Sequence, residues 1–412
     1  MLPAEQQPLL LKGGAIFDSA GRTFRAPVDI LCRNGRIAQI ARPIDPPSDA
    51  TVIDCSGRYV LPGLIDCHVH LTSSGDPGDL NNVRSEPLAV RAWRAERHAR
   101  ATLRAGFTTV RDLGAADHLN IHLARSVESG LIEGPRILAA GFGVTMTGGH
   151  GHGFIAREAD GPDEVRKAVR EQLHAGAGAI KLFASGGVLT PGVDPRSPSF
   201  TEEELRAGVE EAHKAFRVVA AHAQATEGIK NAIRAGVDSI EHGVWLDDEA
   251  VQLMLERGTY MVPTLTAPYL IARGGAAAGI PKYMVDKAQQ VLEDHIASYR
   301  RAIAAGVRVA MGTDQGTPLS RPGENAQEIL RMAEHGLSPA AAILAATAWA
   351  AALLGLSAEC GDLRAALAAD ILVLDADPLT DLAVLTKDEC IRTVVQGGTA
   401  VRHPSDRERG SG

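Results

Sequence analysis

The sequence is poor in aromatic residues and in cysteine, and neither sign of charge dominates it. Phe, Trp and Tyr make up 4% of its 412 residues. The five cysteines (Cys32, Cys55, Cys67, Cys360 and Cys390) are odd in number and show no Cys-x-x-Cys spacing, which argues against a zinc knuckle and indicates reduced, mostly buried thiols. The formal net charge of -8 provides no basic region for nucleic acid, so we expect a small-molecule substrate.

Long hydrophobic runs are also missing. The first residues lack the basic start and small-residue cleavage site of a signal peptide, so a cytoplasmic location is expected. The most apolar tract, 340–356, is shorter than a comfortable membrane span. It predicts a buried helix and no membrane association.

The pattern at the two chain ends predicts one small β domain. Residues 9–60 alternate short apolar runs with turns, and Asn34-Gly35 between two such runs is typical of a hairpin. Strand patterns return over 370–402. We therefore expect a small β-sandwich built from 1–60 and 357–403 around a central domain at 61–356, with 404–412 as a polar tail.

The central domain alternates strand and helix patterns. The helix expected at 203–216 begins with Thr201 and Glu204 at capping-box spacing. Including the stretch at 61–70, the apolar runs predict eight strands, the other seven at 108–112, 136–140, 179–184, 218–222, 239–242, 261–265 and 308–314. Eight such alternations favour an α/β fold of the (β/α)8 TIM barrel type, whose active site lies at the C-terminal strand ends.

Residues 61–70 predict one buried strand that ends in a pair of metal ligands. Side chains alternate faces along a strand, so Asp66, His68 and His70 share a face, and two imidazoles two residues apart can bind one ion. A single His-x-His is weak evidence, because 14 histidines in 412 residues produce such spacings by chance. The interpretation therefore depends on further ligands.

Four further candidates lie on predicted strands, near their C-terminal ends: Lys181, His222, His242 and Asp314. Each alone is better explained as a packed or hydrogen-bonded side chain, but the set with His68 and His70 predicts a site for two divalent ions, zinc first and manganese, cobalt or iron as alternatives. Lys181 stands in an apolar strand, where a neutral amine could add carbon dioxide and bridge two cations as a carbamate. Asp314 could accept the proton of a metal-bridging water and return it to the leaving group.

This pattern resembles the amidohydrolase superfamily over nearly the whole chain. The resemblance implies that His68, His70 and Asp314 hold one metal, that His222 and His242 hold the other, and that carboxylated Lys181 bridges them. A narrower similarity is to the imidazolonepropionase-related, Xaa-Pro dipeptidase-like branch, on the motifs TGGHG at 147–151, IKLFASGGV at 180–188, SIEHG at 239–243 and PTL at 263–265.

The narrower resemblance implies hydrolysis of the amide bond to a C-terminal amino acid, in a dipeptide or an N-acyl amino acid. A cyclic amide hydrolase of the imidazolonepropionase or hydantoinase type is the alternative, and a non-catalytic scaffold the third. Relatives of this kind often form homo-oligomers.

Three residues outside the ligand set are substrate candidates. His150, in a Gly-rich loop, could polarise the scissile carbonyl or only occupy a tight turn. Gln224 stands where several of the similar peptidases have tyrosine, and it could still donate a hydrogen bond to the substrate. Arg196 could bind a carboxylate, although a solvated loop arginine is the commoner outcome.

Overall fold

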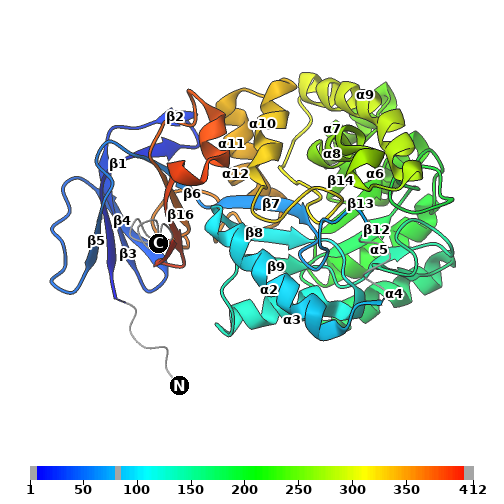
Figure 1. Ribbon diagram of the computed structural model, residues 1–412, viewed down its shortest axis with the longest axis horizontal. Coiled ribbons are helices and arrows are strands. Elements are labelled where there is room, and N and C mark those ends of the chain that lie inside the picture. The colour runs from blue at the N-terminus through cyan, green and yellow to red at the C-terminus, as the bar shows by residue number, and fades with distance from the viewer. Residues whose placement is uncertain (1–6, 79–84, 403–412) are drawn as a thin grey trace.

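The structure is a computed structural model that describes residues 7–78 and 85–402 (Figure 1). A small β-sheet lies at one end of the molecule, and a larger part of mixed strands and helices makes up the rest. The polar tail expected at 404–412 lies outside the described residues, as does the start of the N-terminal segment.

Both chain ends contribute to the small sheet, as predicted. Its strand order is β18-β17-β16-β6-β1-β3-β4, with β2 and β5 also paired to β1. The hydrogen bonds connect these strands through β1, and side chains from both ends of this order pack into one hydrophobic cluster. The strands are β1 (Leu9–Asp18), β2 (Thr23–Phe24), β3 (Val28–Arg33), β4 (Arg36–Ala41), β5 (Thr51–Asp54), β6 (Tyr59–Pro62), β16 (Ile371–Leu374), β17 (Ile391–Gln396) and β18 (Thr399–Arg402).

The larger part contains parallel strands in two groups, β7-β8-β9 and β11-β10-β12-β13-β14-β15. The backbone N–H of Gly178, just before β12, donates to the carbonyl of Ala139 at the end of β9, at 2.8 Å, and so links the groups. The strands are β7 (Leu64–Val69), β8 (Phe107–Asp112), β9 (Arg136–Ala139), β10 (Gly143–Thr145), β11 (Ala156–Glu158), β12 (Ile180–Phe183), β13 (Val219–Ala223), β14 (Ser239–His242) and β15 (Tyr260–Val262).

Helices alternate with these strands and cover their outer side (Figure 1). The predicted capping box is present at α5, where Thr201 accepts from the backbone N–H of Glu204 and the Glu204 side chain accepts in return. Among the described residues, the helices of four residues or more are α2 (Leu88–Arg104), α3 (Leu119–Glu128), α4 (Gly161–Ala175), α5 (Glu202–Lys214), α6 (Thr226–Ala235), α7 (Asp248–Arg257), α8 (Thr266–Gly274), α9 (Lys282–Ala305), α10 (Ala326–Glu334), α11 (Pro339–Ala345), α12 (Ala348–Leu353) and the 3-10 helix Leu382–Thr386.

The single helix expected over 340–356 is two short helices, α11 and α12. Thr347 lies between them with φ -139° and ψ -99°, which is not a helical conformation, so the prediction of one helix was wrong. Within the described ranges, no helix combines the length and the apolar character that crossing a membrane requires.

The eighth expected strand, 308–314, pairs without forming a regular strand. Val309 makes an isolated bridge to Met261 of β15, and Gln315, the residue after the segment, bridges Val69 of β7. The carbonyl of Met311 also accepts from the backbone N–H of Cys67 at 2.8 Å. A Cβ on Gly312 would lie 2.4 Å from Cγ1 of Val262 and 2.9 Å from Cβ of His68, so the glycine lets the segment pass close to both strands.

Residues 61–70, expected as one strand, are two strands separated at Gly63. The residues up to Pro62 belong to β6 of the small sheet, where Pro62 pairs with Ile371 of β16. From Leu64 onward the chain is β7 and pairs with β8. Gly63 donates its backbone N–H to the carbonyl of Asp370 at 2.8 Å, so a single residue connects the two parts of the molecule here.

Gly63→Ala is expected to lower the free energy of unfolding by about 2 kcal/mol through overpacking. A Cβ at this position would lie 2.1 Å from Oγ1 and 2.6 Å from Cγ2 of the buried Thr108. Urea unfolding of Gly63→Ala with and without Thr108→Ala measures the effect, because the second change removes both of those atoms. Equal destabilisation in both backgrounds would contradict this explanation.

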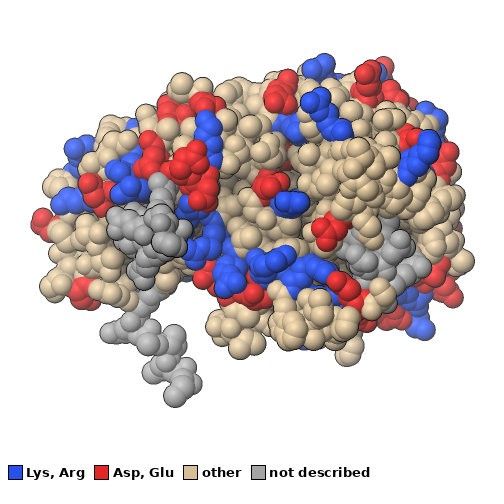
Figure 2. Space-filling model, viewed as in Figure 1, with Lys and Arg blue, Asp and Glu red and all other residues tan. Residues whose placement is uncertain are grey.

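The surface carries charges of both signs. On the face in Figure 2, red and blue side chains are interspersed, and the blue ones gather only in a short row over α2. The part of this face that the structure describes therefore has no continuous basic field.

Candidate metal centre

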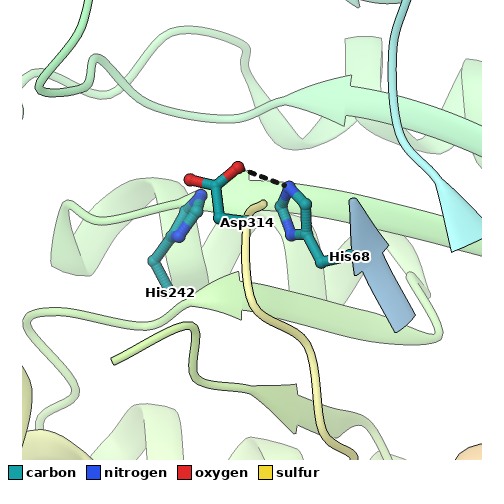
Figure 3. A group of neighbouring side chains, drawn as sticks. All are labelled: His68, His242 and Asp314. Atoms are coloured by element: carbon teal, nitrogen blue, oxygen red, sulfur yellow. Dashed lines mark ion pairs between the residues drawn. The ribbon is translucent and has the colours of Figure 1, made fainter. Parts of the chain in front are cut away.

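β7 and the segment 308–314 bring three of the predicted ligands, His68, His70 and Asp314, together. Figure 3 shows two of these, His68 and Asp314, with His242 beside them. His68 and His70 are two residues apart and buried, with 1% and 8% of their surface exposed. The Nε2 atoms of both lie 3.3 Å from Oδ1 of Asp314. Asp314 has a positive φ of 56°, so its backbone turns out of the strand path at the point where its carboxylate meets the two imidazoles.

The other predicted ligands lie beside this group. One ligand atom each of His68, His242 and Asp314 lies within 4.8 Å of the others. The ring centroid of His242 is 4.6 Å from that of His222. All six predicted ligands, including Lys181, line one pocket.

Each of the four imidazoles uses one ring nitrogen for a bond within the protein. Nδ1 of His68 bonds Glu241 at 2.8 Å, Nδ1 of His70 bonds the Gly114 carbonyl at 3.1 Å, and Nδ1 of His242 bonds the Thr264 hydroxyl at 2.7 Å. His222 instead uses Nε2, which bonds the Gly186 carbonyl at 2.8 Å. The second ring nitrogens of His68 and His70 contact Asp314 Oδ1, itself a predicted ligand. Metal-binding histidines are typically oriented in this way by a bond from the ring nitrogen that does not bind the metal.

The charges of the site suit cation binding. Burial lowers the pKa of Lys181 to about 8, although Glu241 and Asp314 oppose this effect. Burial also lowers the pKa of His222 to about 3, which keeps this ring neutral and able to coordinate. For Asp314, burial alone would raise the pKa, but the charges of His68 and His70 and the hydrogen bond with His70 outweigh it and hold the pKa well below its usual range.

Two buried residues that sequence reasoning missed hold His68 in place. Arg111 in β8 and Glu241 in β14 are both fully buried, and Arg111 Nη2 donates to Glu241 Oε1 at 2.8 Å. Arg111 Nε also donates to the Cys67 carbonyl at 2.7 Å, next to His68. The charged residues inside the strand patterns FTTVRD and SIEH were the available signal.

Asp66 connects the same strand to the segment that carries Asp314. Its Oδ1 accepts from the backbone N–H groups of His68 and Thr313 at 3.0 and 3.1 Å. Its Oδ2 accepts from the Thr313 hydroxyl at 2.7 Å and from Asn325 at 2.8 Å. Asp66 therefore orients ligand-bearing backbone rather than any substrate.

Glu241→Gln is expected to weaken zinc binding by about 10- to 100-fold, because His68 loses the carboxylate that orients it. It should also lower the free energy of unfolding by about 3–5 kcal/mol, since the buried Arg111 loses its counter-charge. Competition titration with a zinc chelator and urea unfolding measure the two effects.

Glu249→Gln is the matched control, because Glu249 pairs with Lys230 at the surface and its side chain is 54% exposed. It should change the free energy of unfolding by less than about 1 kcal/mol. Equal effects of the two substitutions would contradict the role given to Glu241.

Of the three candidate substrate residues, two line the pocket. His150 lies with its ring centroid 4.5 Å from that of His222. Gln224 is buried, and its Oε1 has no hydrogen-bond partner within the described chain. Arg196 is exposed, its guanidinium stacks 5.1 Å from the ring centroid of Trp245, and it is not among the residues that line the pocket.

The pocket walls opposite the polar residues are apolar. They come from the loops after β10 and β12 and from α8 and α9, namely Phe154, Ile155, Val188, Leu189, Ala267, Pro268, Ile271 and Val291. His295 of α9 also lines the pocket and bonds the His242 carbonyl through Nε2 at 2.9 Å.

Comparisons with known proteins agree with this geometry. The amidohydrolase family model matches residues 59–401. Ochratoxinase of Aspergillus niger is 34% identical over 375 residues, covering 84% of this chain and 76% of that protein. Among solved structures, a prolidase complexed with N-methylphosphonate-L-proline is 34% identical with TM-score 0.90, covering 96% of this chain and all of that one. A Xaa-Pro dipeptidase with methionine bound in its active site is 33% identical with TM-score 0.86, covering 95% and 99% of the two chains.

Proposed function

Because the chain belongs to the amidohydrolase family, we propose that it is a binuclear metal-dependent hydrolase of the amide bond to a C-terminal amino acid. The observation that carries the proposal is the convergence of four imidazoles, Lys181 and Asp314 in one pocket. The substrate would be a dipeptide or an N-acyl amino acid. The similar ochratoxinase, prolidase and dipeptidase support this class over the cyclic amides.

We infer that the two strand groups close into a (β/α)8 barrel around this pocket. Two sets of contacts join the edges of the two strand groups. The Gly178–Ala139 hydrogen bond links β9 to the start of β12, and the segment 308–314 links β15 to β7. In such a barrel the ligand-bearing strand ends share one face.

The donors present fit two divalent ions, which we propose to be zinc. One ion would be held by His68, His70 and Asp314, and the other by His222 and His242. Carboxylated Lys181 would be a ligand of both ions. The lowered pKa of Lys181 supports the carbamate, because only the neutral amine adds carbon dioxide. When bound, such ions lower the pKa of a shared water and polarise the amide carbonyl.

The residues of the chain supply the proton transfers and the binding surface. Asp314, ionised because its pKa is lowered, accepts a proton from the attacking water and returns it to the leaving nitrogen. His150 donates a hydrogen bond to the carbonyl oxygen as negative charge develops there. Gln224 would bind the substrate through its amide, and the apolar walls favour substrates with apolar groups. Arg196 remains a prediction for the substrate carboxylate; in the structure its guanidinium stacks on Trp245 outside the pocket lining.

The test is turnover by the zinc-reconstituted chain, supplied with bicarbonate, against dipeptides, N-acyl amino acids and cyclic amides. Release of a free C-terminal amino acid, abolished by a chelator, is the expected result. Activity confined to cyclic amides would overturn the proposed substrate class. A chain that purifies without stoichiometric metal and hydrolyses none of the panel would point to a non-catalytic scaffold.

A further inference from the structure

The side chain of His150 is held on one edge by Thr190 from the loop after β12. Thr190 Oγ1 lies 2.8 Å from Nδ1 of His150. The same oxygen accepts from the backbone N–H of Gly151 at 3.0 Å. Nε2 of His150 makes no hydrogen bond to the residues that the structure describes, and the ring lines the pocket beside His222.

These two contacts decide which nitrogen of His150 carries the proton. The Thr190 oxygen already accepts from Gly151, and its hydroxyl hydrogen finds one acceptor among its contacts, the lone pair of Nδ1. If Nδ1 carried the proton instead, the buried hydroxyl would have no acceptor, at a cost of about 1–3 kcal/mol. The arrangement therefore favours the tautomer in which Nδ1 is unprotonated and Nε2 carries the proton.

The loop that carries Thr190 is itself fixed by α9. Nζ of Lys287 donates to the backbone carbonyls of Gly187, Thr190 and Val193 at 3.2, 2.7 and 2.5 Å. The hydroxyl of Tyr283 donates to the Leu189 carbonyl at 3.0 Å. Four backbone contacts over seven residues hold the loop in one conformation.

The same loop approaches the His150 ring closely. A Cβ at Gly187 would lie 2.6 to 2.8 Å from Nε2, Cε1 and Cδ2 of the imidazole, so the glycine leaves the space that the ring needs. The loop thus sets both the position of the His150 ring and its tautomer.

We propose that Thr190 is a positioning residue that holds His150 in the Nε2-protonated tautomer, with this N–H directed at the substrate. Lys287 supports it by fixing the loop. The use of that N–H rests on the proposed function, whereas the tautomer itself is a property of the protein without substrate. The two are therefore tested separately.

The tautomer is measured directly by ¹⁵N NMR of the zinc-loaded full chain labelled at histidine. The His150 signals are assigned as those missing from His150→Phe. The expected spectrum shows His150 protonated at Nε2 in the parent chain and a mixture of tautomers in Thr190→Val. Protonation at Nδ1 in the parent chain, or an unchanged signal in Thr190→Val, would overturn the proposal whatever the activity.

Kinetics then test the consequence on the best substrate. Thr190→Val should lower kcat by about 10- to 100-fold with little change in KM, since an interaction made mainly in the transition state is weakened. Thr190→Ser, which keeps the hydroxyl, should restore most of kcat. In the His150→Phe background Thr190→Val should have almost no further effect, because the two residues act as one unit.

Thr226→Val is the control for loss of a hydroxyl, because Thr226 Oγ1 donates to the Trp245 carbonyl at 2.8 Å and does not line the pocket. It should leave kcat within about twofold. A full effect of Thr190→Val in the His150→Phe background would overturn the coupling. A chain that hydrolyses none of the substrates yet shows the expected tautomer would overturn the proposed function and leave the positioning role standing.

Discussion

Asp314→Asn should lower kcat by about 100- to 10,000-fold while the fold is preserved. The amide keeps the shape of the carboxylate but cannot accept the proton of the attacking water or return it to the leaving nitrogen. The size of the effect follows from the position of Asp314, whose Oδ1 is the common neighbour of His68 and His70 at 3.3 Å.

Loss of metal would also lower turnover in this variant, so kcat must be compared at measured zinc content. Activity is measured over a series of zinc concentrations, and the metal content of each sample is determined. This separates loss of metal from loss of proton transfer. Asp163→Asn is the control, because that side chain is 99% exposed on α4. Near-normal kcat of Asp314→Asn at full zinc content would disprove the proton-transfer role.

Lys181→Met should reduce the bound zinc from two ions to one or fewer and abolish most activity. Methionine has a similar length and suits the apolar strand, but it cannot form a carbamate that bridges two cations. Lys181→Arg should behave in the same way, because a guanidinium remains charged and does not add carbon dioxide. Metal analysis after dialysis against zinc-buffered solution is the measurement.

A bicarbonate series makes this prediction sharper. Metal-free parent chain reconstituted in carbon dioxide-free buffer should gain activity slowly, and added bicarbonate should speed the gain, whereas neither Lys181 variant should respond. Lys282→Met, at an 81% exposed position of α9, serves as the control for loss of a lysine charge. Two tightly bound ions in Lys181→Met would contradict the bridging role.

The position of the ligands could be predicted because strands impose a simple rule on side chains. His68 and His70 share a face through their spacing of two, and parallel strands put their C-terminal ends at the same edge. This rule was enough to select the six residues that the structure brings into one pocket.

The orientation of His242 could not be predicted in this way. Glu241 and His242 are neighbours, so a regular strand would point them to opposite faces, yet Glu241 bonds His68 and His242 lines the pocket. The φ of 71° at His242 turns the chain and permits both contacts. Because the sequence does not reveal this turn, the role of Glu241 was missed.

Buried charge and exposed charge also look alike in a sequence. Arg111 is among the largest fully buried side chains, whereas Arg196 is exposed and stacks on Trp245. The difference depends on partners distant in the sequence, namely Glu241 for the first and Trp245 for the second. The separate strand β6 before Gly63 was missed for a similar reason, since it pairs with β16, which lies about 310 residues further along the chain.

The pairing of β6 with β16 has a consequence for the order of events during synthesis. Pro62 cannot find its partner Ile371 until nearly the whole chain has left the ribosome. The strand that carries His68 continues directly from β6, so its anchoring waits until β16 has been translated. Zinc capture is therefore expected to follow translation rather than accompany it, and a nascent chain arrested before residue 371 should leave the ligand strand unanchored.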